Sequence, residues 1–551
     1  MAVKAQFSLS VVLRLVSALL LGLTIASPQA IAKPSVLDPE AIEAAGAVIR
    51  DVVLDRQNVF NLGDPKEDRR LYRLANRLHV VTREEVIRGQ LLFQPGDRFD
   101  ARLLEETERI LRRNEFFIDA TVRPIAFEGG MVDIEVVTED VWSLTPKASF
   151  SRSGGENRVS LGAEEVNLLG NGQFLRARYL SNVDRDSTQL EFEDRTLNHG
   201  WWGLLVRAAD NSDGDSALIS LERPFPALDA RWSAGLRFTT DDRVTPLYSL
   251  GDENAEFRHE RDFHRIYGGW SMGLKSGWVR RWTAGYIHDD NRFSAPLEPD
   301  PGRVTVIPTD RNLRYPFIGL EILEDNFEKA ENVNVMGRTE DVLLGARLAA
   351  TLGYSSTTLG ADRNAWVASA QGSVGFGSLN SKALLLGFNG QARLEDGDLR
   401  NARLRFDARY YRRQSDRRTF FVEVSGTAGD NLDLDDPIEL GGRTGLRGYP
   451  LRYQGGDSKA VLSVEQRWFT NKYPFRLFRL GGAVFADVGR AWGENPIGEE
   501  NQGWLRDVGF GLRIAPVRAS RRIVHIDFSF PLDGDSSIDS VQVLFRARST
   551  F

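Results

Sequence analysis

Apolar and polar residues alternate with a period of two along most of the chain after residue 142. The segment "STQLEFEDRT" sets Leu190 and Phe192 between polar neighbours, and "RWSAGLRF", "RLRFDARYY" and "FFVEVSGTAG" behave in the same way. Polar turns rich in Gly, Asn and Asp separate these segments, as expected for strands that bury one face. At about 25 residues per strand with its connection, residues 142–551 predict an all-β transmembrane barrel of about 16 antiparallel strands.

Residues 46–140 carry a different pattern, which predicts the order strand, helix, helix, strand, strand. Thr82 with Glu85 three residues later forms a capping box that predicts the start of the first helix. Asp100 is placed to cap the second helix, whose apolar face consists of Leu103, Leu104, Ile110 and Leu111. The turn Gly129-Gly130 joins the last two strands. We therefore expect a small α+β domain with two helices on one face of a three-stranded sheet and open sheet edges.

The N-terminus has the organisation of a signal peptide over residues 1–32. Lys4 and Arg14 supply positive charge, residues 15–26 are apolar, and Ala30-Ile31-Ala32 offers the small residues that a signal peptidase recognises. A retained helical anchor is the alternative, but the apolar run is too short to span a bilayer. The chain is therefore predicted to be exported.

Composition narrows the class of protein further. The net charge of -7 argues against nucleic acid as a partner, because such proteins carry a basic face. The chain has no cysteine, which removes disulfides, thiol catalysis and thiolate metal sites. An exported chain without cysteine fits a bacterial envelope better than a disulfide-stabilised secreted domain.

Two features favour a membrane barrel over a soluble β-sandwich or propeller. Aromatic residues lie near the predicted strand ends, where membrane barrels carry interfacial girdles: Trp201, Trp202, Trp270, Trp278, Trp282, Trp468 and Trp504. The last segment, "SVQVLFRARSTF", places Phe545 and Phe551 on its apolar face and ends the sequence at Phe551. An amphipathic terminal strand with a final aromatic residue resembles the recognition signal of outer-membrane barrels.

Three motifs follow one another in the second half of the barrel region. They are Leu446-Arg447-Gly448-Tyr449 within "GGRTGLRGYP", Glu465 within "VLSVEQRW", and Phe485-Ala486-Asp487-Val488-Gly489. In this order they resemble motifs of the BamA/TamA superfamily of outer-membrane assembly and transport proteins, the bacterial surface antigen family. The upstream α+β unit resembles a single POTRA domain of that superfamily, and "EVNLLGNGQ" resembles an early barrel hairpin. The resemblance covers nearly the whole mature chain.

The resemblance implies a luminal clasp, in which the loop folds into the barrel and its arginine meets acidic residues of the inner wall. The residues expected there are Arg447, Gly448, Tyr449, Glu465, Asp487 and Gly489. The chemistry of these residues agrees with such a clasp. A guanidinium presents a planar fork of donors suited to carboxylates, and both acids alternate with apolar neighbours, which places them on the polar face of their strands. The alternative is an ordinary exposed hairpin in which Arg447 only aids solubility.

The motifs that suggest catalysis are less specific than the motifs of the clasp. "GWSMG" fits the pattern of a nucleophile elbow around Ser271, but no helix is predicted after it. His259 and His264 in "HERDFH" lack the helical spacing of a zinc site. The paired acids Asp289-Asp290 and Asp435-Asp436 look like solvated turns. We therefore expect no enzymatic activity, no cofactor and no metal.

The sequence thus predicts an outer-membrane barrel, with its N-terminal domain in the periplasm, that assists insertion or translocation of client proteins. Unfolded or extended client polypeptides, outer-membrane lipid and periplasmic accessory proteins are the expected partners. A seam between the first strand, in "WSLTPKASFSR", and the strand ending at Phe551 is expected to open, because Pro146 lacks a ladder donor. The alternatives are a passive porin-like channel or a dedicated transporter, including one with a lipid-related role.

Overall fold

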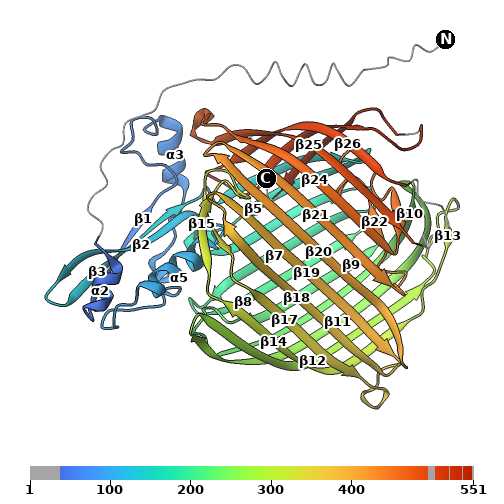
Figure 1. Ribbon diagram of the computed structural model, residues 1–551, viewed down its shortest axis with the longest axis horizontal. Helices are drawn as coiled ribbons and strands as arrows, with labels where there is room; N and C mark the ends of the chain where they lie inside the picture. The colour runs from blue at the N-terminus through green and yellow to red at the C-terminus, as the bar shows by residue number, and fades with distance from the viewer. Residues whose placement is uncertain (1–36, 494–502, 520, 537, 549–551) are drawn as a thin grey trace, which may run out of the picture.

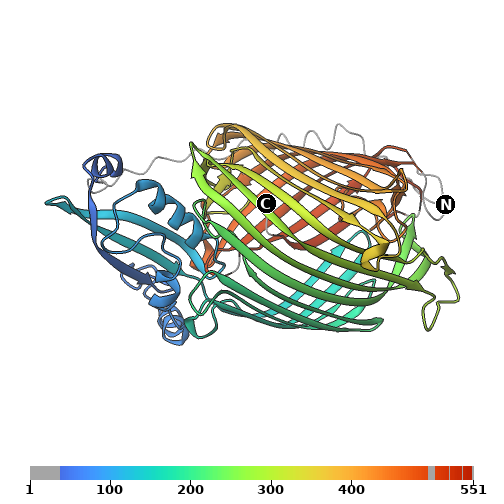
Figure 2. The same cartoon turned by 90° about the horizontal axis from the view of Figure 1, so that it is seen from below.

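A small α+β domain lies against one end of a large closed barrel (Figures 1 and 2). This computed structural model describes residues 37–493, 503–519, 521–536 and 538–548. The predicted signal peptide, residues 1–32, and the predicted terminal Phe551 lie outside the described residues. We call the end of the barrel that carries the domain the domain end, and the other the distal end.

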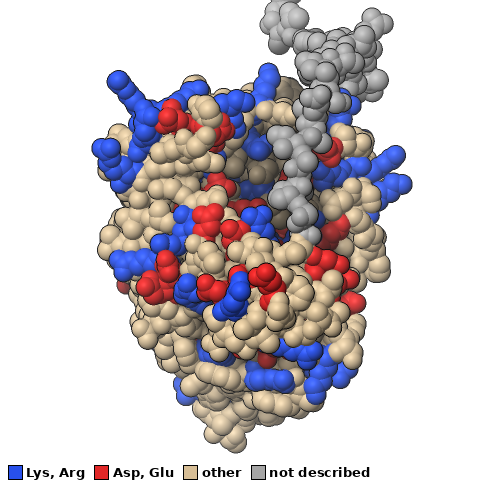
Figure 3. Space-filling model, turned by 90° about the vertical axis from the view of Figure 1, so that its left-hand side faces the viewer, with Lys and Arg blue, Asp and Glu red and all other residues tan. Residues whose placement is uncertain are grey.

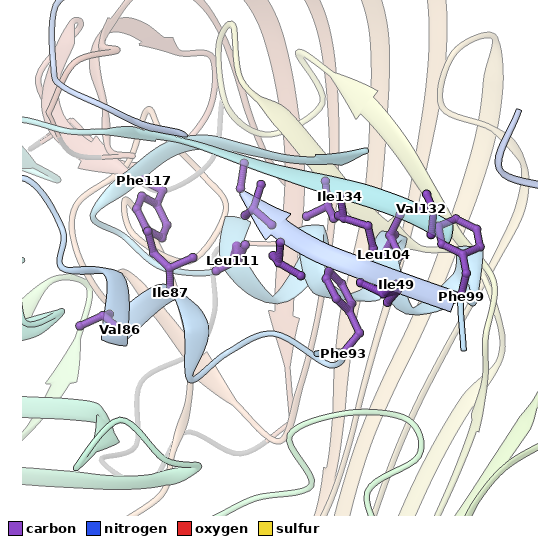
Figure 4. Packing of buried hydrophobic residues seen from close by; sticks show 14 of the residues in the cluster. Ile49, Val86, Ile87, Phe93, Phe99, Leu104, Leu111, Phe117, Val132 and Ile134 are labelled. Carbon is purple, nitrogen blue, oxygen red and sulfur yellow. The ribbon is translucent and has the colours of Figure 1, made fainter. Parts of the chain in front are cut away.

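The α+β domain is built on a three-stranded sheet in the order β1-β3-β2, with β1 parallel and β2 antiparallel to β3. Its elements are α2 (Pro39–Ala44), β1 (Val48–Gln57), α3 (Arg70–Leu78), α4 (Glu84–Arg88), α5 (Ala101–Arg112), β2 (Phe117–Glu128) and β3 (Met131–Asp140). Asp100 caps α5 as predicted, accepting the amide hydrogens of Arg102 and Leu103. Leu104 and Leu111 of α5 pack against Val132 and Ile134 of β3 in one apolar core (Figure 4).

The prediction of Thr82 as a helix cap is wrong. Helix α4 begins at Glu84, and Arg83 holds the N-cap position without a side-chain hydrogen bond. Thr82 is fully buried, and its amide nitrogen and hydroxyl lie 2.8 and 3.0 Å from the carboxylate of Asp140. The buried Asp140 needs donors, and His79 lies 3.0 Å from the same carboxylate. This requirement of the core overrides the local capping pattern.

Twenty long strands close the barrel within the described residues. They are β4 (Leu144–Ser153), β5 (Glu156–Glu165), β6 (Gln173–Ser181), β7 (Asp186–Leu197), β8 (Trp202–Asn211), β9 (Gly214–Arg223), β10 (Trp232–Ser249), β11 (Asp252–Lys275), β12 (Trp278–Ser294), β14 (Arg311–Glu324), β17 (Arg347–Ser355), β18 (Ala365–Ser378), β19 (Lys382–Glu395), β20 (Asp398–Ser415), β21 (Arg418–Asp430), β24 (Ser458–Phe469), β25 (Phe478–Trp492), β26 (Leu505–Pro516), β27 (Ile523–Pro531) and β28 (Gln542–Arg548). Short β13 (Val304–Thr305) pairs in parallel with β11. Three single 3-10 turns are η1 (Leu168–Gly170), η2 (Thr357–Leu359) and η3 (Pro474–Arg476).

The predicted number of about 16 strands is therefore wrong. The assumed 25 residues per strand and connection is too long, because many connections are tight turns of two residues. Gly154-Gly155, Gly277 and Gly397 hold such turns with positive φ values, a conformation that glycine adopts without strain. No helix in the described parts of the chain combines the length and apolar character needed to cross a bilayer.

The barrel wall separates an apolar outer surface from a polar lumen. Along β25, Val484, Ala486 and Val488 face outwards, while Phe485 and Asp487 face the lumen and are buried. Tryptophans cluster on strand segments at the domain end, several of them exposed: Trp202, Trp232, Trp270, Trp278, Trp282 and Trp468. An apolar belt bordered by such a girdle is the surface of a barrel that spans a membrane.

Candidate functional site

The connection between β21 and β24, residues 431–457, folds into the lumen from the distal end. It contains a short hairpin of β22 (Ile438–Leu440) and β23 (Gln454–Gly456), with the Leu446-to-Tyr449 motif at its tip. Leu446 and Tyr449 are fully buried. We call residues 431–457 the luminal loop.

Arg447 is bound to the inner wall through its whole guanidinium group. Its Nε and Nη2 donate to the two carboxylate oxygens of Asp487 at 2.6 and 2.7 Å, and Nη1 donates to Glu465 at 2.6 Å. Nη2 also donates to the Ser463 hydroxyl at 3.0 Å, and the guanidinium carbon lies 3.5 Å from the centre of the Phe485 ring. Such a bidentate pair with a second carboxylate is geometrically specific, and a lysine cannot reproduce it.

The glycines and the tyrosine of the motif fix the tip at the same wall. The Gly448 amide donates to Asp507 at 3.1 Å, and a Cβ atom at Gly448 would lie 2.6 Å from the Cβ of Asp507. The Tyr449 hydroxyl donates to the Arg506 carbonyl at 2.7 Å. Gly489 leaves space for Leu446, since a Cβ there would lie 3.2 Å from that side chain. The structure thus brings all six predicted clasp residues together on the loop, β24 and β25.

Sequence reasoning missed three members of this cluster: Ser463, Phe485 and Asp507. All three occupy inward-facing positions beside the predicted acids. The family resemblance identified Glu465 and Asp487. Because inward positions repeat with a period of two, considering every inward position of the three strands would also have identified the other three residues.

A second anchor holds the first part of the luminal loop to a different section of the wall. Arg393 of β19 donates to both carboxylate oxygens of Asp433, at 2.6 and 2.9 Å. Arg311 of β14 lies 3.0 Å from Asp435, and Arg403 of β20 lies 2.9 Å from Asp436. Asp435 and Asp436 thus lie in a turn, as predicted, but their carboxylates are bound to the wall and are not simply solvated. These acids tie the loop to β14, β19 and β20, on the other side of β21 from the clasp.

A third anchor lies near the end of the loop. Arg452 donates to both oxygens of Asp184, in the turn between β6 and β7, at 2.6 and 3.1 Å. Its guanidinium carbon also lies 4.1 Å from the ring centre of Tyr248 on β10. The luminal loop therefore crosses the barrel and contacts its wall on three sides.

At the domain end, the connection between β14 and β17 forms an inserted hairpin. It consists of β15 (Phe327–Glu331) and β16 (Thr339–Leu343), and we call residues 327–344 the domain-end hairpin. Met336 at its tip is buried in a cluster with four residues of β24 to β27: Phe469, Ala483, Ala515 and Ile523. Figure 1 shows β15 at this rim, between the barrel and α5. The hairpin therefore reaches across the opening from the wall where it begins to another wall.

Helix α5 of the α+β domain is bound to this hairpin. Arg112 donates from Nε and Nη2 to the two carboxylate oxygens of Asp341, at 2.8 and 2.7 Å, and Glu108 forms an ion pair with Lys329. Burial disfavours the charge of Arg112, but the hydrogen bond and the charge of Asp341 hold its pKa above the ordinary value. Arg338 in the hairpin donates to the carbonyl of Val517 at 2.7 Å. Domain, hairpin and barrel rim are thus joined by buried polar contacts.

The barrel closes through a seam between its first and last strands. Among the described residues, strands β28 and β4 share one register pair, Phe545 with Arg152. By contrast, β4 pairs with β5 along its entire length, and β27 pairs with β28 along all of β28. Pro146 lies in β4 and has no amide hydrogen for a ladder bond. The described part of the seam therefore carries less pairing than the β4–β5 and β27–β28 junctions on either side of it.

The apparent catalytic motifs lie inside strands. Ser271 and both histidines, His259 and His264, belong to β11, and no helix follows Ser271 as a nucleophile elbow requires. In the described residues, no group of histidine and acidic side chains is arranged to hold a metal ion. The interpretation of Asp289-Asp290 as a turn is wrong, because both lie within β12 and Asp289 accepts a hydrogen bond from Arg261 at 2.8 Å.

Comparison with known proteins finds similar solved structures, but the sequence itself matches no known family or curated protein. No protein-family profile matches the chain, and no curated protein matches its sequence. The structure is similar to BamA from Haemophilus ducreyi lacking POTRA domains 1-3, with 11% identity and a TM-score of 0.36 over 91% of this chain and 84% of that one. It is also similar to CdiB from Acinetobacter baumannii (12% identity, TM-score 0.42, 91% and 73% covered) and to CdiB from Escherichia coli (12%, 0.47, 91% and 76%).

Proposed function

We propose that this chain is an outer-membrane barrel that inserts or translocates client polypeptides, with its α+β domain in the periplasm. The observation that carries the proposal is the seam, where one register pair joins the described residues of β28 to β4. An opened seam presents two unpaired strand edges beside the lipid. An extended client can add a strand to such an edge and gain main-chain hydrogen bonds without a particular sequence.

The α+β domain supports the capture of clients before delivery. Strand β1 lies at one edge of its sheet. Among the described residues, backbone hydrogen bonds to that edge come from the segment 96–99 and reach only to Ile49. Residues 52–57 of β1 therefore form an open edge that suits an extended polypeptide.

The two obstructions of the lumen argue against the alternative of a passive channel. The luminal loop crosses the barrel from the distal end, and the domain-end hairpin reaches across the other opening. A porin needs a continuous aqueous path. Both features favour delivery at the seam over diffusion through the lumen.

Reconstitution into lipid vesicles tests this proposal. We expect vesicles that contain the protein to fold an added outer-membrane client several-fold faster than empty vesicles, measured as the heat-modifiable gel shift of the client. We also expect planar-bilayer recordings to show little steady current. Unchanged client folding together with a large, constant porin-like current would contradict the proposal and support the passive channel.

A further inference from the structure

Helix α3 exposes a stripe of leucines that the fold of the domain does not use. Leu71, Leu74 and Leu78 are 66%, 49% and 65% exposed. Their spacing of three and four residues places them on one side of the helix. Tyr72, on the side that faces the domain, is only 4% exposed and stacks on Phe60. The leucine stripe is thus a surface that remains apolar after the domain has folded.

An arginine stripe runs beside the leucines. Arg70, Arg73 and Arg77 repeat with the same spacing, and at 100° per residue they lie next to the leucine stripe, away from Tyr72. Arg73 forms an exposed ion pair with Asp68 at 2.5 Å. Figure 3 shows the domain end of the whole molecule in a space-filling view. Lys and Arg side chains project along its upper part, and basic and acidic side chains are mixed near its centre. A helix with adjacent leucine and arginine stripes is typical of segments that lie in a membrane surface.

The position of α3 on the barrel places these stripes at the level of the membrane. The Tyr72 hydroxyl donates to the carbonyl of Phe475, in the turn between β24 and β25. Phe475 is itself 71% exposed, and Trp468 of the domain-end girdle lies shortly before it on β24. Figure 1 shows α3 beside this rim of the barrel. Helix α3 therefore lies beside the rim at which the apolar outer surface of the barrel begins.

Helix α3 also lies close to the seam. Trp142, which precedes the first barrel strand β4, packs in one cluster with Tyr72 and with Leu477 of the β24–β25 turn. The Trp142 amide donates to the carbonyl of Arg518, in the turn between β26 and β27, at 2.7 Å. Through Tyr72 and Trp142, the helix is thus connected to the start of β4 on one side of the β28–β4 junction and to the β26–β27 turn on the other.

We propose that α3 is an interfacial anchor that binds the phospholipid leaflet at the domain end. The leucines lie at the boundary between headgroups and acyl chains, and the arginines contact lipid phosphates, with a preference for anionic headgroups. The anchor holds the α+β domain against the bilayer beside the seam. This inference concerns lipid binding by the domain and does not depend on what the barrel transports.

The absence of native cysteine allows a direct test in the intact, reconstituted protein. A variant with Leu74→Cys carries an environment-sensitive fluorophore, and the vesicles contain lipids with a nitroxide quencher at shallow depth. Glu128→Cys, exposed at the β2–β3 hairpin of the same domain, is the matched control. We expect strong quenching at residue 74 and little at residue 128. Equal, weak quenching at both sites would overturn the proposal. A fluorophore at residue 74 that becomes shielded from water only after a soluble protein is added would also overturn it.

The arginine stripe gives a second, independent measurement. Arg70→Gln with Arg77→Gln keeps the apolar stripe and removes two exposed charges. In vesicles rich in phosphatidylglycerol we expect this variant to lose much of the quenching at residue 74, and in purely phosphatidylcholine vesicles to lose less of it. Quenching that is the same in both vesicle types, with and without the arginines, would contradict the arginine contacts with lipid.

Discussion

Arg447→Ala is expected to abolish most of the client-folding activity while the protein remains in the outer membrane. The change leaves the buried carboxylates of Glu465 and Asp487 without their shared cation. Breaking a buried ion pair by removing one partner costs about 3–5 kcal/mol, so the tip of the luminal loop is expected to leave the wall. The client-folding assay measures the loss, and heat-modifiability of the variant itself shows that its barrel is still formed.

Two further variants make this prediction specific. Arg443→Ala removes an exposed arginine of the same loop and should leave activity unchanged. Arg447→Lys should restore activity only in part, because an ammonium group cannot bind both carboxylates and Ser463 as the planar guanidinium does. Wild-type activity in both Arg447 variants would show that the clasp has no role in function.

Removal of the domain-end hairpin is expected to increase ion conductance by a large factor. Deletion of residues 327–344 joins Asn326 to Gly345, and the Glu324 amide already donates to the carbonyl of Ala346 at 2.9 Å. The shortened connection is a three-residue hairpin loop with glycine in its last position, a favoured geometry that keeps β14 paired with β17. The barrel should therefore stay closed while one obstruction of its lumen is lost.

Planar-bilayer recording measures this effect directly. Asp341→Ala removes the two hydrogen bonds between the hairpin and Arg112 and keeps the hairpin itself, so we expect a smaller increase, seen as brief openings rather than a constant current. An unchanged conductance after the deletion would show that the hairpin does not obstruct the lumen.

The clasp was predicted because its motifs resemble those of a known superfamily, and the chemistry of the residues agrees with that resemblance. A guanidinium suits carboxylates, and Glu465 and Asp487 each occupy the polar positions of an alternating strand. The second anchor could not be predicted in the same way, because Asp433, Asp435 and Asp436 lie in irregular sequence without a period. Their arginine partners are distant in sequence, and only the closure of the barrel brings them together.

The domain-end hairpin and the strand number fail for a related reason. β15 and β16 are only five residues long and have no clear alternation, so the sequence does not tell whether this hairpin joins the wall or folds across the opening. The number of strands depends on the length of each turn, which composition estimates poorly. Helix α3 was not predicted, although Leu71, Leu74 and Leu78 have the spacing of an amphipathic helix; sequence alone would not have shown that this apolar side stays exposed.

A disulfide across the seam tests the central claim, that the barrel delivers clients by opening between β28 and β4. Arg152→Cys with Phe545→Cys joins the register pair that the described residues of this junction form. Phe528→Cys with Val543→Cys is the matched control, because it locks the fully paired β27–β28 junction. We predict that oxidation stops client folding only in the first variant and that a reducing agent restores it. Full activity with the seam locked would contradict lateral opening.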